Sequence, residues 1–453
     1  MPLDEKAKQE ALESIKASGV EFIHLLFTDV LGYLKTIAVT SSEIEHAIDE
    51  GMGFDGSSVQ GFARLEESDM IAFPDPSTLK IRQSPGSGVH QPLDKKANVA
   101  SMFCNIETPD GEPFEGDPRE VLKRVLKKAA AMGYTAYMGP ECEYFYLKDA
   151  GNNPVGLDTL SYFDQSMIDL GSQVRSDTVS RLRDYGIEVE YSHHEAAPSQ
   201  HEIDLRYKEA LKMADQVIAY RTIVKETAAI NGVHATFMPK PLNGVNGSGM
   251  HVHQSLFTSE GNAFYDPRAK FQLSGVARSY IAGLLRHAPA FSLVTNQWVN
   301  SYKRLVAGFE APVYLIWAHL NRSALVRVPL YKPGKEAATR IELRSPDPSC
   351  NPYLAFAAMI AAGLDGIERG LEPPEDTEFD VFELSEEEIE AQGIELLPGD
   401  LHEAIKAFEK SELMREVMGE QVFKYLLANK RAEWDAYRTR VSTWEVESLV
   451  ANV

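Results

Sequence analysis

Four strand-like runs in this chain place charged or metal-binding side chains two residues apart. They read MGPECEYFYL, EVEYSHHEAAPSQHEIDLRY, NGVNGSGMHVHQSL and ATRIELRSPDP. Alternate residues of a β-strand point to the same face, so each run has one polar, reactive face and one face that a core can cover. Whether the four strands converge does not follow from the pattern itself.

The side chains that share these faces are carboxylates, histidines and arginines. Glu141 and Glu143 lie on one face of the first run, with Cys142 on the other. His251 and His253 share a face of the third run, behind a Gly-rich turn. The second run supplies Glu190, His193, His194, Glu195 and Glu202, and the fourth supplies Arg340, Glu342 and Arg344.

Such a set of side chains points to divalent cations. Like carboxylates repel one another, and burying them without partners is very costly. Mg²⁺ or Mn²⁺ would neutralise a cluster of glutamates with one histidine, and Mg²⁺ commonly bridges protein carboxylates to nucleotide phosphates. A single Glu-x-Glu or His-x-His pair is more often a solvated strand face, so this prediction depends on the strands meeting.

A basic group follows in NSYKRLVAGFEAPVYLIWAHLNRSALVRVP, which holds Arg304, Arg322 and Arg327. Arginine binds carboxylate and phosphate in bidentate fashion. Taken alone, these arginines are best explained as surface ion pairs of an acidic protein. Together with carboxylates for metal they indicate phosphoryl transfer. The chain has no P-loop and no kinase His-Arg-Asp motif, so an ATP site here must be of another type.

The composition indicates which classes of partner and which cellular compartment suit this protein. Lys and Arg number 45 against 67 Asp and Glu, a formal charge of −22, which disfavours nucleic acid and anionic membrane. Three scattered cysteines, Cys104, Cys142 and Cys350, favour a reducing cytoplasm over a disulfide framework. The N-terminus lacks the apolar core of a signal peptide. The most apolar stretch, 353–363, is shorter than the roughly 20 residues that a membrane span needs.

Local patterns predict the organisation of the chain. An amphipathic helix over 6–17 precedes a hairpin that turns at 29–32, and Ser42 with Glu45 predicts a capping box on a short helix ending near Gly51. The stretch TPDGEPFEGDPRE is interpreted as a linker before a helix over 118–132. The tail, 400–453, predicts two or three helices.

Seven strings taken in order resemble type I glutamine synthetase, from about residue 20 to the C-terminus. They are FDGSS, PECEYF, HHEAAPSQHEID, KPLNGVNGSGMHVHQS, NSYKRLVAGFEAP, NRS and RIELRSPDPSCNPYLAF. The resemblance implies an α+β fold: a β-grasp-like domain at 1–105 and, at 106–453, a catalytic domain of the glutamine synthetase/guanido kinase type with a helical tail. It also implies a dodecamer of two hexameric rings, with active sites between subunits.

The resemblance also implies a role for each matching residue. Two metal ions, Mg²⁺ or Mn²⁺, are implied in each active site: one on Glu143, Glu195 and Glu202, the other on Glu141, His251 and Glu342. Glutamate is implied at Asn246, Gly247, Arg304 and Arg344, phosphates at Arg322, Arg327 and Arg340, and the nucleotide at Glu190, His253 and Ser255. The ammonium pocket is implied at Tyr162 and Glu195, with Asp55 and Ser58 of a neighbouring subunit. Glu310 lies in the implied flap.

The implied reaction has two steps. The side-chain carboxylate of glutamate attacks the γ-phosphate of ATP, and ammonia then displaces phosphate from the γ-glutamyl phosphate to form glutamine. Asp55 would take the proton of ammonium, and flap closure at Glu310 would exclude water. Arg64 lies where the feedback-inhibited subtype, which is not adenylylated, has an arginine, implying inhibition by glutamine. An ion pair of this arginine with Glu66 or Glu67 explains it equally well.

Several positions depart from the family pattern and keep other functions open. Ser199 stands where Gly is usual, the flap at 306–309 lacks its usual Pro, and LSYFDQSMID replaces a Gly-Gly-Tyr-Phe-Asp stretch around Tyr162. One alternative is a γ-glutamyl ligase for a polyamine or alkylamine, although the acidic ammonium pocket is retained. Another is a non-catalytic nitrogen sensor, which predicts a missing ligand or arginine. Trp444, Leu449 and Val450 fit a docking strap between rings or a helix end packed on its own subunit.

Overall fold

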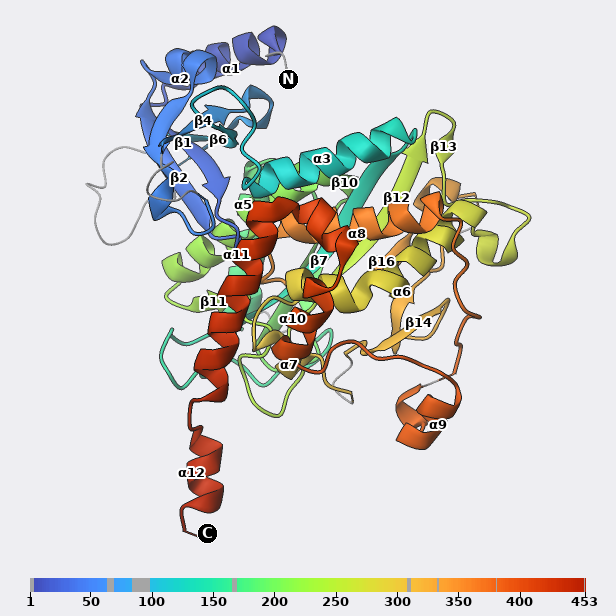
Figure 1. Ribbon diagram of the computed structural model, residues 1–453. Coiled ribbons are helices and arrows are strands. Elements are labelled where there is room, and N and C mark those ends of the chain that lie inside the picture. Colours follow the sequence, from blue (N-terminus) through green and yellow to red (C-terminus); the bar gives the residue numbers. More distant parts are fainter. Residues whose placement is uncertain are drawn as a thin grey trace.

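The computed structural model describes residues 4–62, 69–83, 98–164, 169–307, 311–331, 334–379, 381–451 and 453. Figure 1 shows a small N-terminal unit beside a larger unit of helices around a long sheet. The N-terminal sheet has the order β2-β1-β6-β4-β3, with β5 paired to β6. Its elements are α1 (Glu5–Ser18), β1 (Phe22–Thr28), β2 (Leu34–Thr40), α2 (Ile44–Glu50), β3 (Met52–Asp55), β4 (Asp69–Pro74), β5 (Lys80–Gln83) and β6 (Asn98–Glu107).

Local sequence signals explain most of these N-terminal elements. Asp4 caps α1 by accepting hydrogen bonds from the backbone of its first turn, and Gly19 ends the helix with a φ of 65°. The predicted hairpin is confirmed, because β1 and β2 pair antiparallel around the turn at 29–32. The predicted capping box at Ser42 is wrong. Helix α2 begins one residue later, with Glu43 at the N-cap position and no side-chain cap bond.

The larger unit is built on a ten-stranded sheet, with the order β14-β15-β16-β12-β7-β9-β8 along its main path. Strands β10 and β11 pair with β7, and β13 pairs with β12. Its strands are β7 (Thr135–Leu147), β8 (Val189–His194), β9 (Gln200–Leu205), β10 (Lys208–Glu209), β11 (His234–Thr236), β12 (Met250–Thr258), β13 (Gly261–Asn262), β14 (Tyr314–Ala318), β15 (Ala324–Arg327) and β16 (Ile341–Leu343).

Helices cover one face of this sheet. Helices α3 and α5 pack on β7, α4 packs on β8, and α6 packs on β14, β15 and α8. The helices are α3 (Pro118–Ala131), α4 (Leu170–Asp184), α5 (Ala210–Ile230), α6 (Gly275–Thr295), α7 (Ser301–Arg304), α8 (Pro352–Glu368), α9 (Glu386–Ala391), α10 (Leu401–Glu409), α11 (Glu412–Arg438) and α12 (Thr443–Leu449). The three helices of the C-terminal tail agree with the prediction.

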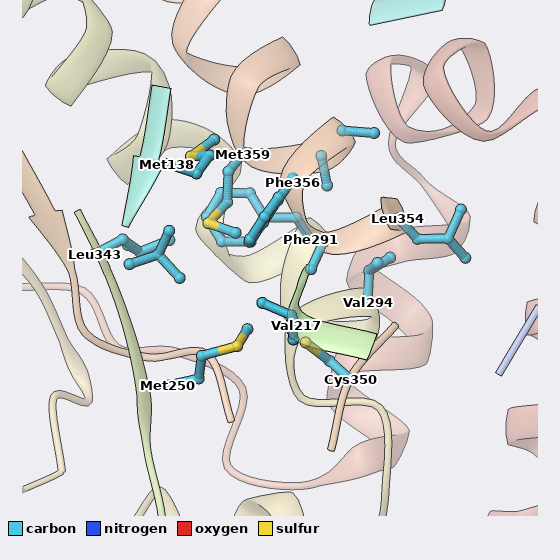
Figure 2. Packing of buried hydrophobic residues seen from close by; sticks show 14 of the residues in the cluster. Met138, Val217, Met250, Phe291, Val294, Leu343, Cys350, Leu354, Phe356 and Met359 are labelled. Carbon is cyan, nitrogen blue, oxygen red and sulfur yellow. The ribbon is translucent and has the colours of Figure 1, made fainter. Parts of the chain in front are cut away.

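The core lies between the sheet and these helices. Apolar side chains of the central strands meet apolar side chains of α5, α6 and α8 (Figure 2). From the strands come Met138, Met250 and Leu343, and from the helices Val217, Phe291, Val294, Leu354, Phe356 and Met359. Because strand side chains alternate, the opposite face of the same strands is left for polar groups.

Two further features concern the surface. Among the described residues, no helix combines the length and the apolar character that crossing a membrane requires. Helix α12 stands clear of the body at the C-terminal end (Figure 1), and its Trp444 side chain is 70% exposed. Packing of this helix end on its own subunit, one of the two alternatives considered for it, is therefore not what the structure has.

Candidate functional site

The register of four neighbouring strands gathers the predicted reactive side chains on the face away from the helices. Glu141 of β7 is paired with His251 of β12, and Glu143 of β7 is paired with Glu202 of β9. On the other side of β12, His253 is paired with Glu342 of β16. The convergence on which the metal prediction depended is therefore present in the structure.

The first cluster joins Glu141, His251 and Glu342, whose ligand atoms lie within 4.8 Å of one another. His251 Nδ1 is 3.5 Å from Glu141 Oε2 and 3.8 Å from Glu342 Oε1. Arg344 donates to Glu342 Oε1 at 2.7 Å, and Arg327 donates to the other oxygen of this carboxylate. These are the three residues that the resemblance assigned to one metal ion.

The second cluster joins His193, Glu195 and Glu202, again within 4.8 Å of one another. His193 Nε2 donates to Glu195 Oε1 at 2.8 Å and lies 3.3 Å from Glu202 Oε2. Glu143, which the resemblance placed with Glu195 and Glu202, is adjacent in the sheet. Its carboxylate accepts from Gln200 Nε2 at 2.7 Å and from the backbone N–H of Gly249 at 2.9 Å.

Burial and mutual repulsion favour the protonated forms of Glu143 and Glu202, whereas burial would raise the pKa of Glu195 but the hydrogen bond from His193 lowers it. Burial, reinforced by the charge of Glu195, raises the pKa of Glu143 to about 8. Burial and the neighbouring carboxylates, Asp204 first, also raise the pKa of Glu202 well above its ordinary value. One buried oxygen of Glu202, Oε1, has no hydrogen-bond partner. A divalent cation would supply both the missing charge and the missing partner, so this set of donors fits such an ion.

The first cluster is electrostatically different. Burial alone would raise the pKa of Glu342, but Arg344, followed by the two histidines of β12, lowers it to about 2. Burial would likewise raise the pKa of Glu141, but the imidazoles of His253 and His251 hold it well below its ordinary value. Burial and the charge of Arg344 lower the pKa of His251, which favours the neutral imidazole that ligates metals. Glu141 and Glu342 are therefore ionised at neutral pH, the form in which a carboxylate can ligate a metal.

Both clusters lie in one strongly polar cavity of about 360 Å³. Its lining includes the predicted metal ligands and the predicted substrate residues of the larger unit: Glu141, Glu143, Tyr162, Glu195, Glu202, Asn246, Gly247, His251, Arg304, Arg322, Arg327, Glu342 and Arg344. Arginines and carboxylates meet in this cavity, because Arg327 and Arg344 both bond to Glu342, so it offers donors for an anion beside oxygen ligands for a cation.

Arg304 is built into the wall of this cavity. Its guanidinium is buried and donates to the backbone carbonyls of Arg344, Ser345 and Pro346 at 2.7–3.1 Å. The loop before β12 passes directly against it, because a Cβ on Gly247 would lie 3.1 Å from Arg304 Cβ and 2.2 Å from the carbonyl oxygen of Pro239. Glycine is therefore required at this position for the close approach.

A second cavity of about 310 Å³ adjoins the first. The residues predicted to contact the nucleotide all line it: Glu190, His253, Ser255 and Arg340. His253 Nε2 donates to Glu141 Oε1 at 2.7 Å, while Arg340 Nε donates to His253 Nδ1 at 3.2 Å. Glu141 and Tyr191 line both cavities, so this carboxylate lies on the boundary between them.

Some predicted residues are not brought to these cavities, or lie outside the described residues. Asp55 and Ser58 are exposed on the N-terminal unit, and neither lines the two cavities of the same chain. Hydrogen bonds from Ser57 lower the pKa of Asp55. Glu310 and Arg64 lie outside the described residues, as does the altered segment 165–167. Arg322 lines the first cavity from an exposed loop position.

Sequence reasoning also missed residues of the site. His193 was noted in its run but given no role, although it lies near the end of β8, two residues before Glu195, and its ring contacts that carboxylate. Gln200 alternates with Glu202 on β9 and therefore shares its face. The aromatic rings of Tyr137 and Tyr207 line the second cavity, 5.8 Å apart between centroids, and no pattern in the sequence singled out Tyr207, which lies between β9 and β10.

Comparisons with known proteins agree with this geometry. Residues 115–449 match the family described as glutamine synthetase, catalytic domain, and residues 19–109 match glutamine synthetase, beta-Grasp domain. The chain belongs to the glutamine synthetase family. This confirms the resemblance that the ordered motifs indicated and the fold expected from it.

Relatives of this family match along the whole chain. The chain is 48% identical to a glutamine synthetase of Mycolicibacterium smegmatis over 99% of this chain and 100% of that protein. It is 46% identical to a glutamine synthetase of Thermus thermophilus over 98% of this chain and 99% of that protein. A solved Plasmodium falciparum glutamine synthetase superposes with a TM-score of 0.87 at 26% identity, and the match covers 97% of this chain and 98% of that one. A structure described as a GmaS/ADP complex superposes with a TM-score of 0.86 at 32% identity, covering 97% and 99%.

Proposed function

We propose that this protein is an active glutamine synthetase, which uses ATP to join ammonia to the side-chain carboxylate of glutamate. The observation that carries the proposal is that Glu141 lines two adjoining cavities. One is polar and large enough for an amino acid, and the other is lined with the predicted nucleotide residues. A γ-phosphate placed at this boundary would face both the metal-binding carboxylates and the glutamate carboxylate. That is the arrangement that phosphoryl transfer requires.

Two divalent cations, Mg²⁺ or Mn²⁺, would be held at this boundary. Glu141, His251 and Glu342 would hold one, and Glu143, Glu195 and Glu202 the other, with His193 beside the second set. Bound there, the ions would neutralise phosphate charge during transfer. The first set contributes ionised carboxylates and a neutral imidazole. In the second set, Glu143 and Glu202 would lose their protons on binding the ion.

Arginines and the loop before β12 would orient the substrates. Arg304 and Arg344, with Asn246 and Gly247, would hold glutamate in the first cavity. Arg327 and Arg322 would face the transferring phosphate from the same cavity, and Arg340 would face it from the second. Fixed positive charges offset the charge that develops on the phosphoryl oxygens and later on the departing phosphate.

The amine step would be completed by a second subunit. Asp55 and Ser58 of a neighbouring chain would join Tyr162 and Glu195, and Asp55 would take a proton from ammonium so that free ammonia attacks the γ-glutamyl phosphate. Glu310 would close over the intermediate, and Arg64 would mediate inhibition by glutamine. We propose a dodecamer of two hexameric rings, supported by the exposed apolar side chains of α12. The three buried, unpaired cysteines fit a cytoplasmic location.

The test is ADP release by purified protein with ATP, Mg²⁺ and glutamate, comparing ammonium with methylamine and putrescine. Turnover that requires glutamate and is strong with ammonium alone is the expected result. Turnover with only a larger amine would keep the ligase chemistry but overturn the assignment of the amine. Absence of turnover with every amine would overturn the proposed activity.

A further inference from the structure

Two residues, the partly buried Asp158 and the buried Ser199, tie the loop that carries Tyr162 to the turn between β8 and β9. The backbone N–H of Ser199 donates to Asp158 Oδ1 at 2.8 Å. The backbone N–H of Asp158 donates to Ser199 Oγ at 3.0 Å, and this hydroxyl is 3.3 Å from the carbonyl oxygen of Asp158, to which it donates. Three hydrogen bonds therefore join the two residues, and we call them the 158–199 clamp.

The clamp continues to His194, the last residue of β8, directly before Glu195. His194 Nε2 lies 3.1 Å from Asp158 Oδ1, and His194 Nδ1 lies 2.7 Å from the carbonyl oxygen of Glu195. Further along the loop, the backbone N–H of Phe163 donates to the carbonyl oxygen of His194 at 3.0 Å. The loop is thus fastened to β8 at both ends of the segment 158–163.

Side-chain packing does not explain how Tyr162 keeps its place. The side chains of Tyr162 and Phe163 are 46% and 60% exposed, stacked on each other at 4.0 Å and touching His193 edge-on. Exposed rings gain little from burial, so backbone and polar contacts must fix the loop. The clamp supplies such contacts where water cannot compete, since Ser199 is fully buried.

Backbone strain marks the same two segments. Ser199 has a φ of 66° and Phe163 a φ of 61°, both in the left-handed region that non-glycine residues avoid. Ser199 stands where the family usually has glycine, which would adopt this φ without strain. Its hydroxyl fits because residue 156 is glycine: a Cβ there would lie 2.5 Å from Ser199 Oγ. A strained residue that uses its side chain in the clamp indicates a positioning role.

A cation site is the other explanation for this region, because ligand atoms of Asp158, His194 and His201 lie within 4.8 Å of one another. Arg175 donates to His201 Nδ1 at 2.7 Å, so Nε2 carries the proton and has no lone pair to offer. The guanidinium would also repel a cation. Both observations favour a positioning role for Asp158 over metal binding.

We propose that Asp158 and Ser199 are positioning residues that hold Tyr162 over the first cavity, beside Glu195, and thereby set the affinity for the amine. The proposal rests on the proposed function, in which Tyr162 and Glu195 face ammonium. Removing the clamp should weaken amine binding without changing the glutamate or ATP sites. Loss of one or two buried hydrogen bonds corresponds to roughly a tenfold change in an equilibrium constant.

The test compares S199G, S199A and D158A with wild-type protein. Michaelis constants for ammonium, glutamate and ATP are measured together with amide hydrogen exchange over 157–163. All three variants should raise the ammonium KM about tenfold, leave the other two KM values within about twofold, and speed exchange in this loop. S199G and S199A both lose the hydroxyl but differ in stability, because glycine relieves the strain at φ 66° and alanine does not.

The two serine variants thus separate positioning from stability. An equal rise in ammonium KM with a higher melting temperature for S199G than for S199A is the expected result. D149A serves as the control, because Asp149 is exposed and accepts a hydrogen bond from the backbone N–H of Gly151 in its own turn. An unchanged ammonium KM despite faster exchange, or an equal rise in all three KM values, would overturn the proposal. Failure of the proposed function would appear earlier, as absence of turnover by wild-type protein, and would overturn both.

Discussion

Glu141 lies between the two cavities and contacts side chains of both. One of its oxygens accepts from His253, whose other nitrogen is held by Arg340 on the nucleotide side. The other oxygen is 3.5 Å from His251, within the first cluster. The side chain thus links the proposed nucleotide site to the proposed metal site, and no neighbour in the sheet has this pair of contacts among the described residues.

Substituting Glu141 should therefore disable both sites at once. E141Q keeps the shape of the side chain but removes a ligand charge, and we expect glutamate-dependent ADP release to fall by about a hundredfold or more, with weaker Mn²⁺ binding. Steady-state kinetics and titration with Mn²⁺ measure the two effects. E188Q is the matched control, because Glu188 is exposed and pairs with Lys208 outside the cavities. Activity of E141Q within about threefold of wild type would contradict the assignment.

The raised pKa values of Glu143 and Glu202 predict a pH dependence of metal binding. A carboxyl whose pKa is raised in the folded protein holds its proton near neutral pH, and burial together with the charge of Glu195 raises the pKa of Glu143 to about 8. Such a group favours the folded state below its unfolded pKa, and this contribution is lost as pH rises through its folded pKa. A bound cation needs the ionised carboxylate, so binding must release protons and must strengthen as pH rises.

The measurement is the gain in melting temperature on adding Mg²⁺, compared at about pH 6.5 and about pH 8.5. We expect the larger gain at the higher pH. Calorimetric titration in two buffers of different ionisation enthalpy should show proton release. Equal gains at both pH values would show that Glu143 and Glu202 are not ligands.

At the scale of elements, alternation along single strands was predictable from sequence and the pairing of strands was not. The sequence pattern correctly placed Glu141 and Glu143 opposite Cys142, because the period of two is a local property. The pairing of β12 between β7 and β16 joins segments far apart in the chain, and no local rule specifies it. The same limit explains Asp204 and Gln200: they alternate with Glu202, yet only the register shows that their face is the reactive one.

The loop between β11 and β12 yields a prediction of its own. In G247A the new Cβ would meet a backbone carbonyl oxygen, which cannot move aside as a flexible side chain can. We expect the loop to shift against Arg304, raising the glutamate KM about tenfold or more and lowering stability by about 1–3 kcal/mol. The ATP KM should change less than about twofold, since the second cavity is lined by other elements.

The matched control for this prediction is G275A at the start of α6. A Cβ there meets nothing within 4 Å, and alanine favours the helix. It should leave all kinetic constants unchanged and stability equal or slightly higher. If G247A behaved like G275A, the close approach of the loop to Arg304 would have no part in substrate binding.

At the scale of the whole molecule, a buried arginine joins the two units. Arg119 at the start of α3 donates to Asp75 and Asn105 of the N-terminal unit and to Asp215 of α5 at 2.6–3.1 Å. Such a network fixes the N-terminal unit against its own catalytic unit. Asp55 therefore stays away from the cavities of its own chain. The division at residue 105 remains a prediction. The ring assembly remains one too, because a single chain holds no contact between subunits.

If Asp55 acts in the cavity of a neighbouring chain, two inactive variants should complement each other. D55A lacks the proposed base, and E342Q lacks a proposed metal ligand, so each alone should have less than about one hundredth of wild-type turnover. In hybrid oligomers made from equal amounts of both, a site is intact when its catalytic unit comes from D55A and its N-terminal unit from E342Q. Random assembly gives this combination at about one site in four.

Coexpression with two affinity tags, isolation of the hybrids and an ammonium-dependent assay would measure this recovery. Turnover approaching a quarter of the wild-type value per subunit is expected, whereas a mixture of separately assembled variants should stay inactive. The mixture is the control, because it contains the same chains without shared interfaces. If hybrids were as inactive as the mixture, each site would have to be built from one chain. The inactivity of D55A would then have to come from altered folding or assembly, not from a missing base, since the Arg119 network holds Asp55 away from both cavities of its own subunit.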